Sequence, residues 1–142
     1  MSADEIGCVC FHARRGSRAV SQFYDRFMRP AGIRSAQYAM LSFIHRNENT
    51  SVGELAEFLC MDQSTATRNL ERLEKENYVE FSVCPDDGRR KLLRLTSAGE
   101  EKLSEASSLW EAAQDVMRDR LGQDDFRALV RILGKVAALT RN

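Results

Sequence analysis

The segment from residue 50 to residue 96 carries the pattern that most restricts what this chain can fold into. Ser51 followed by Glu54 is a capping-box pair, which predicts a short helix that ends near Cys60. Asp62 is a good N-cap for a second helix that begins almost at once. Apolar residues recur on one face of each helix, at Leu55, Ala56 and Leu59 and at Ala66, Leu70 and Leu73. A helix-turn-helix is therefore expected.

The second of these helices has a polar face opposite its apolar stripe. That face is made by Gln63, Ser64, Thr67, Arg68, Glu71 and Arg72. Glutamine can pair with adenine, arginine with guanine, and serine or threonine with either base, while a helix fits the major groove of B-form DNA. The face therefore predicts a helix that recognises DNA sequence.

A two-stranded hairpin is expected after this helix. Apolar and polar residues alternate over 79–84 and again over 91–95, which is typical of half-buried strands. Between them, Pro85 and Gly88 mark a turn, and Arg89 and Arg90 are expected at its exposed tip. Arginines at such a tip can enter a minor groove, as a wing beside a helix-turn-helix would.

These residues resemble the MarR-type winged-helix transcriptional regulators. Asp87-Gly88-Arg89 is similar to the Asp-x-Arg wing of that family, and residues 93–99 are similar to the Leu-Thr-x-x-Gly that opens its next helix. The likeness extends over nearly the whole chain. It implies that Arg89 reaches the minor groove and that Asp87 steadies the wing. The predicted DNA-binding set is Gln63, Ser64, Thr67, Arg68, Arg72, Arg89 and Arg90.

Helices are expected on both sides of this unit, over 10–29, 35–46, 97–121 and from 124 onward, which makes six in a mainly helical chain. Ser97, with Glu100, is expected to cap the third of them. The last helix is expected to point its apolar face inward, with Phe126, Leu129, Val130, Leu133 and Val136. We predict a DNA-binding region at 35–96 and a helical dimerisation region formed by 1–34 and 97–142.

A homodimer is expected because the terminal helices are too apolar for a small winged-helix unit to bury alone. Two-fold symmetry would present two recognition helices about 34 Å apart to successive major grooves of a palindromic operator. Arginine is concentrated in residues 11–34, whereas acids outnumber bases from residue 100 to 125. This asymmetry favours complementary packing of the helices, with a cationic lining for an anionic effector as the alternative.

Composition restricts the classes of function. The 142 residues carry a formal net charge of +0, so attraction to DNA must come from local arrangement and non-specific affinity should be modest. The four cysteines and two histidines have no zinc-ligand spacing, and no phosphate loop or nucleophile–base motif is present. We expect no metal site and no cofactor, and we do not expect the protein to be an enzyme. Charges interrupt every hydrophobic segment, which predicts a cytoplasmic protein without membrane contact.

A possible sensor lies near the N-terminus. Cys10-Phe11, residues 17–20 and Tyr24 resemble the organic-hydroperoxide-sensing branch of the family, which implies that Cys10 is oxidised and that Tyr24 bonds to it. That branch has a second tyrosine where this chain has Arg14, whose charge would favour the thiolate. The alternative is that Cys10 is only a small apolar residue.

Together these features predict a sequence-specific DNA-binding regulator, a repressor released by a small-molecule effector or by oxidation of Cys10. The alternative function is a winged-helix module that binds protein and not DNA, because a fold does not determine a function. The wing distinguishes the two, since a DNA reader needs Arg89 exposed.

Overall fold

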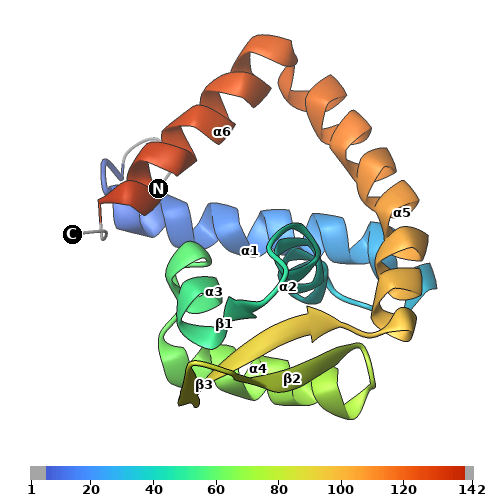
Figure 1. The fold of residues 1–142 in the computed structure, drawn as a ribbon. Helices are drawn as coiled ribbons and strands as arrows, with labels where there is room; N and C mark the ends of the chain where they lie inside the picture. The colour runs from blue at the N-terminus through green and yellow to red at the C-terminus, as the bar shows by residue number, and fades with distance from the viewer. Residues whose placement is uncertain (1–5, 140–142) are drawn as a thin grey trace.

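The computed structural model describes residues 6–139 and has the mainly helical winged-helix fold that the sequence predicts (Figure 1). Its elements in chain order are α1 (Val9–Met28), the 3₁₀ turn η2 (Arg29–Ala31), α2 (Ser35–Arg46), β1 (Thr50–Ser51), α3 (Val52–Phe58), α4 (Gln63–Lys75), β2 (Val79–Cys84), β3 (Asp87–Leu95), α5 (Ser97–Leu121) and α6 (Gln123–Ala138).

The sheet has three strands, where the sequence predicted two. β2 and β3 form the expected antiparallel hairpin, and the two-residue strand β1 adds to the other side of β3, with Thr50 opposite Leu93. A strand of two residues shows no alternation, and its pairing depends on a partner more than forty positions away in the chain. The third strand therefore leaves no local signal in the sequence.

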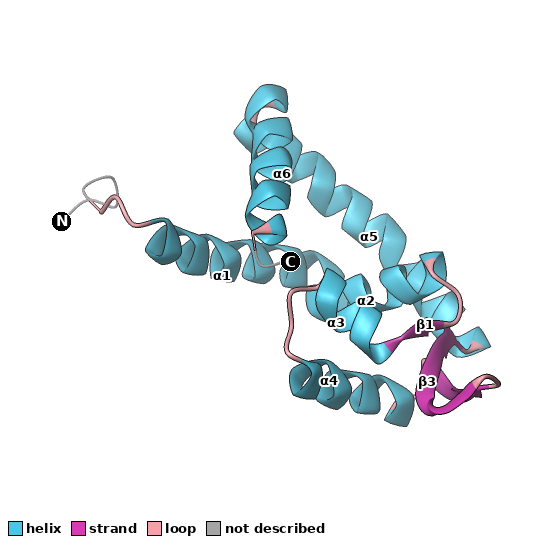
Figure 2. Ribbon diagram, turned by 60° about the vertical axis from the view of Figure 1, so that its left-hand side comes forward, coloured by secondary structure: helices cyan, strands magenta, loops and turns pink. Residues whose placement is uncertain are grey.

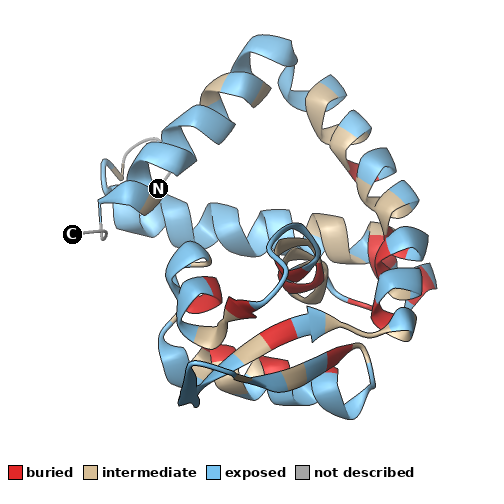
Figure 3. Cartoon of the chain, in the orientation of Figure 1, coloured by how far each residue is buried: buried red, intermediate tan, exposed pale blue. Residues whose placement is uncertain are grey.

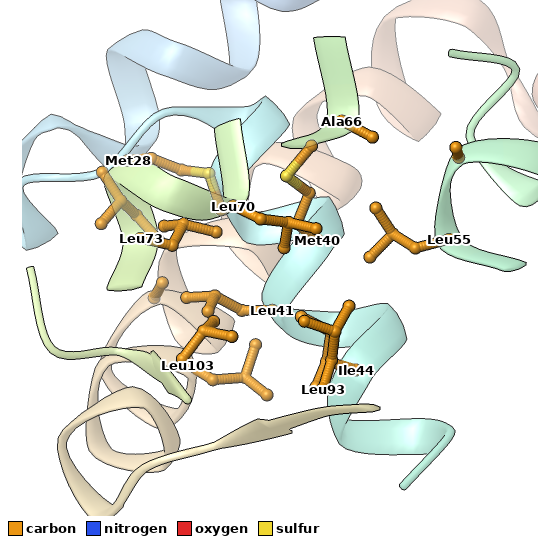
Figure 4. Close-up of a cluster of buried hydrophobic side chains, with 14 of the residues drawn as sticks. Met28, Met40, Leu41, Ile44, Leu55, Ala66, Leu70, Leu73, Leu93 and Leu103 are labelled. Atoms are coloured by element: carbon orange, nitrogen blue, oxygen red, sulfur yellow. The ribbon is translucent and has the colours of Figure 1, made fainter. Parts of the chain in front are cut away.

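The core lies between α2, the two helices of the helix-turn-helix and the sheet. Met40, Leu41 and Ile44 of α2 are at most 1% exposed and meet Leu55, Leu70, Leu73 and Leu93 (Figure 4). Met28 before η2, and Leu103 with Ala106 on α5, complete the same cluster. The apolar stripes predicted for the helix-turn-helix are therefore confirmed, and they position α4 with its polar face outward.

The terminal helices are much less buried than this core (Figure 3). α5 packs on α1 and α2, but α6 turns back from the end of α5 so that the two helices form a V, as Figures 1 and 2 show. No residue of α6 is buried, and Val130, Ile132 and Leu133 are between 48% and 60% exposed. The expectation that the apolar face of α6 points inward is wrong for the single chain.

The start of α5 differs from the prediction by one residue. Its N-cap is Thr96, whose hydroxyl accepts a hydrogen bond from the backbone nitrogen of Gly99 at 3.0 Å, and not Ser97. The same hydroxyl donates to the carbonyl oxygen of Asn77 at 2.5 Å. Thr96 thus joins the start of α5 to the end of α4, a contact that capping patterns do not include.

Candidate nucleic-acid interface

Asp62 fixes the beginning of α4. Its carboxylate accepts hydrogen bonds from the Ser64 hydroxyl and from the backbone nitrogen of Thr65, both at 2.7 Å. These bonds lower the pKa of Asp62 to about 2, and the bond from Ser64 has the largest effect. The N-cap predicted from the sequence is confirmed, and it remains charged at neutral pH.

The outward face of α4 carries the residues that the sequence assigned to DNA recognition. Gln63, Ser64, Arg68 and Arg72 are exposed, and Thr67 is half-buried. The Thr67 hydroxyl donates to the carbonyl oxygen of Gln63 at 2.8 Å, and the Arg68 guanidinium donates to the Thr65 hydroxyl at 3.4 Å. Each side chain can still turn toward a ligand, because none is held by a buried partner.

The wing turns earlier than the sequence predicted. Pro85 and Asp86 form the turn, β3 starts at Asp87, and Arg89 and Arg90 therefore lie inside β3 instead of at the tip. The Asp87 carboxylate accepts a hydrogen bond from the backbone nitrogen of Arg89 at 3.0 Å. That bond is the kind of support that the family resemblance implies for Asp87.

The ladder between β2 and β3 is irregular next to the turn. Val83 pairs with Lys91, but the next residue, Cys84, pairs with Asp87. Residues 88–90 therefore have no partner in the register and bulge from the strand. A bulge cannot be recognised from residue types alone, so the two arginines were misplaced by the sequence pattern.

A groove of about 600 Å³ lies between the first turn of α3, α4 and the wing. Gln63 and Thr67 of α4 line it together with Asp87, Arg89 and Arg90 of β3. Ser64, Arg68 and Arg72 do not line it, so the predicted set is divided between the groove and the free side of α4. Helix and wing thus face one opening, where the wing contributes cationic groups and α4 contributes polar groups together with the acidic Glu71 and Glu74.

Sequence reasoning missed the second role of Glu54. The Arg90 guanidinium donates to the carboxylate of Glu54 at 2.5 Å, while hydrogen bonds from the Thr50 hydroxyl and the Ser51 backbone lower the pKa of Glu54. Its position in a capping box explained Glu54 fully, so nothing in the sequence pointed to Arg90. One of the arginines assigned to DNA is therefore already paired.

The two residues of the predicted sensor lie far apart within the chain. Cys10 and Tyr24 are both on α1, and fourteen residues of helix separate them by about 21 Å. The Tyr24 hydroxyl instead donates to the amide oxygen of Gln114 on α5, and burial raises its pKa above the ordinary value. Cys10 is exposed and unbridged. A bond between Cys10 and Tyr24 of one chain is therefore excluded.

Neither a metal site nor a membrane span is found in the part of the chain that the structure describes. Within residues 6–139, no three histidine, cysteine, aspartate or glutamate side chains gather as metal ligands would. No helix in this range combines the length and the apolar character needed to cross a bilayer.

Known proteins match both the sequence and the fold. The MarR family model matches residues 33–91. The HTH-type transcriptional regulator BilQ of Clostridioides difficile is 25% identical over 111 residues, which are 78% of this chain and 75% of BilQ.

The similar solved structures include complexes with DNA. The transcriptional regulator MosR of M. tuberculosis in complex with DNA is 31% identical, with 95% of this chain and 99% of MosR covered and a TM-score of 0.82. A mutant MarR of E. coli complexed with operator DNA is 25% identical, with 94% and 96% covered and a TM-score of 0.83. The chain therefore belongs to the MarR family of winged helix-turn-helix, DNA-binding transcriptional regulators.

Proposed function

We propose that the protein is a homodimeric repressor that binds a palindromic operator with α4 in the major groove and Arg89 in the minor groove. The observation that carries this proposal is the groove shared by α4 and the wing, where Gln63 and Thr67 face the same opening as Arg89. A helix and a hairpin arranged in this way can follow neighbouring grooves of one duplex. The DNA complexes of MosR and of E. coli MarR, two proteins of similar fold, support DNA as the ligand.

The contacts are proposed to divide by chemistry. Gln63, Ser64, Thr67 and Arg68 are near the N-terminus of α4 and would reach base edges, whereas Arg72, more than a turn later, would pair with a phosphate. Asp87 would keep the wing in shape. BilQ and MosR are bacterial proteins, and bacterial operators lie in the cytoplasm. We therefore propose the cytoplasm as the location of this protein.

Dimerisation is proposed to use residues 1–34 and 97–142, leaving 35–96 to bind DNA. The support is the exposed apolar surface of α6, together with Val9, Phe11 and Val20 of α1, which are 40% to 71% exposed in the single chain. Apolar surface of this extent marks an interaction site. The division is not sharp, because Met28 and Leu103 belong to the same core as α4.

Selection of the preferred duplex from random DNA tests the function directly. The expected result is a palindrome with two half-sites about 10 base pairs apart, bound by two protomers. Because the net charge is zero, binding to unrelated duplexes should be weak. Failure to enrich any sequence, with equal binding to all duplexes, would exclude a sequence-specific regulator.

An anionic small molecule is the first proposed effector. A pocket of about 610 Å³ beside the end of α1 is lined by Arg26, Arg29 and Arg34, and Asp25, which also lines it, is bonded to the backbone of Ser35 at 2.7 Å. The three arginines form no ion pair within residues 6–139, so their charges are available to an anion. If this pocket is the site, the variant Arg29→Gln should keep its operator but lose release by organic anions.

Oxidation of Cys10 is the second proposed signal, as in the hydroperoxide-sensing branch. The thiolate would attack a peroxide oxygen of ROOH, giving a sulfenic acid on Cys10 and the alcohol ROH after proton transfer. Tyr24 would have to come from the partner protomer, since the two residues of one chain are too far apart. Organic hydroperoxide should release the wild type from its operator and leave Cys10→Ser bound. Release of Cys10→Ser at the wild-type rate would exclude Cys10 as the sensor.

A further inference from the structure

The carboxylate of Glu54 connects three elements. One oxygen accepts hydrogen bonds from the Thr50 hydroxyl at 2.8 Å and from the Ser51 backbone nitrogen at 3.2 Å. The other accepts from the Arg90 guanidinium at 2.5 Å. Thr50 is only 3% exposed and belongs to β1, so a buried residue holds one oxygen of the carboxylate while the other oxygen meets Arg90.

The topology explains why Arg90 meets α3. β1 pairs with β3 at Leu92 and Leu93, and α3 starts immediately after β1. Because β1 and β3 are antiparallel, the first turn of α3 lies beside the residues of β3 that precede Leu92 and lead back to the wing. Arg90 is in the bulge of residues 88–90, which no register pair holds. Its bond to Glu54 is thus a tether on a part of the wing that the ladder leaves loose.

We propose that Arg90 is a positioning residue, whose ion pair with Glu54 holds the base of the wing against α3 so that Arg89 is directed into the minor groove. The inference rests on the proposed function, and it replaces the direct DNA contact that the sequence predicted for Arg90. Both side chains of the pair are about half exposed, at 47% and 51%. Such a pair contributes little to folding, so its effect on the wing can be separated from stability.

The direction in which DNA affinity changes when Glu54 is neutralised distinguishes a tether from a direct contact. Glu54 is an anion beside a surface that would meet phosphates, so removal of its charge should by itself strengthen DNA binding. If Arg90 touched DNA directly, freeing it from Glu54 would add to that gain. If Arg90 acts through Glu54, neutralising Glu54 should weaken binding.

The experiment measures operator affinity at fixed salt for Glu54→Gln, Arg90→Gln and the double variant, using the duplex selected by the wild type. Glutamine retains the capping box, since its amide oxygen can accept the same bonds from Thr50 and Ser51. The matched control is Glu80→Gln, because Glu80 is a similarly exposed carboxylate on the same hairpin, 3.8 Å from Arg94. Thermal melts check that every variant is folded.

Each single variant is expected to weaken binding at least threefold, the double variant to be no weaker than Arg90→Gln, and Glu80→Gln to bind as well as the wild type or better. In an Arg89→Ala background, Glu54→Gln should leave affinity unchanged or slightly higher, because the tether acts through Arg89 and only the loss of the negative charge remains. A purely structural role of Glu54 would lower affinity equally in both backgrounds, and this result would overturn the inference.

Unchanged or tighter operator binding by Glu54→Gln would also overturn the inference. If Arg90→Gln at the same time bound the operator more weakly than the wild type, Arg90 would be a direct DNA contact. A wild-type protein that binds no operator would instead overturn the proposed function, so the two failures are distinguishable.

Discussion

Gly99 shows how a single residue fixes the position of the wing relative to α5. A Cβ at this position would overlap the backbone carbonyl of Tyr78, and that carbonyl already accepts a hydrogen bond from the backbone nitrogen of Thr96 at 3.1 Å. Neither partner is a flexible side-chain end that could move aside. The glycine of the Leu-Thr-x-x-Gly pattern is therefore required by close backbone approach and not by a turn.

The substitution Gly99→Ala should lower the free energy of unfolding by at least about 1–3 kcal/mol, the usual cost of overpacking, because backbone must move. Gly53→Ala is the control, since its added methyl would meet only the Ser51 hydroxyl at an ordinary 3.9 Å. Urea unfolding of both variants measures the difference. Equal stability of Gly99→Ala and the wild type would contradict the close approach.

Loss of the wing arginine should act on DNA binding and not on folding. Arg89 is exposed, its backbone nitrogen donates to Asp87, and its side chain has no hydrogen bond or ion pair with any residue from 6 to 139. Arg89→Ala should therefore weaken operator binding at least several-fold, given about 1–3 kcal/mol for a good groove contact, while the melting temperature stays the same. A titration at fixed salt that shows unchanged affinity would remove Arg89 from the interface.

At the scale of elements, sequence reasoning succeeded where the signal is local. The caps at Ser51 and Asp62 and the apolar stripe of α4 depend on residues three or four apart, and all are confirmed. Sequence reasoning failed where the local structure depends on contacts between segments that are far apart in the chain. The strand β1, the bulge that contains Arg89 and the bond from Arg90 to Glu54 each depend on segments that meet only after folding.

Positive backbone angles were equally invisible to sequence reasoning. Cys60, in the turn between α3 and α4, and Asn77, after α4, have φ of 55° and 65°. Asparagine adopts this region readily, but cysteine does so rarely, and a glycine would have marked the turn more clearly. The helix-turn-helix turn was therefore predicted from the end of one apolar stripe and the N-cap of the next, not from turn residues.

The recognition helix makes a prediction of its own. If Arg68 contacts a base edge, Arg68→Ala should relax sequence preference at one position of each half-site. Arg72→Ala, one turn further, should weaken all sequences alike and reduce the salt dependence of log K by about one ion, because a phosphate contact is lost. Selection experiments with both variants compare the two positions. Wild-type preference and affinity in Arg68→Ala would place Arg68 outside the interface.

For the whole molecule, the exposed terminal helices are the main feature of the single chain. α1, α5 and α6 form an open three-sided arrangement above the helix-turn-helix and the sheet (Figure 1). The expectation that the protein is not an enzyme is confirmed by its membership in a family of regulators. With a net charge of zero, the molecule as a whole is not attracted to DNA, so the proposed homodimer would gain its affinity from two correctly spaced recognition helices.

A charge on the apolar face of α6 should therefore separate the protomers. Leu133 is 52% exposed in the single chain, so Leu133→Asp should leave the protomer folded while disrupting an interface that covers this face. Lys135→Asp, on the opposite side of the same helix, is the control. Sedimentation equilibrium should find monomers only for Leu133→Asp. A dimer in both variants would assign the interface to other residues.

The spacing of the two half-sites tests the central claim most directly. Affinity is measured for the selected palindrome and for the same palindrome with about five base pairs inserted at its centre, which turns one half-site to the opposite side of the duplex. A two-fold dimer with α4 in successive major grooves should bind the original site with two protomers and lose at least tenfold in affinity for the altered one, by the loss of about 1.4 kcal/mol or more. Equal affinity for both duplexes would contradict the account, because each protomer would then bind its half-site alone.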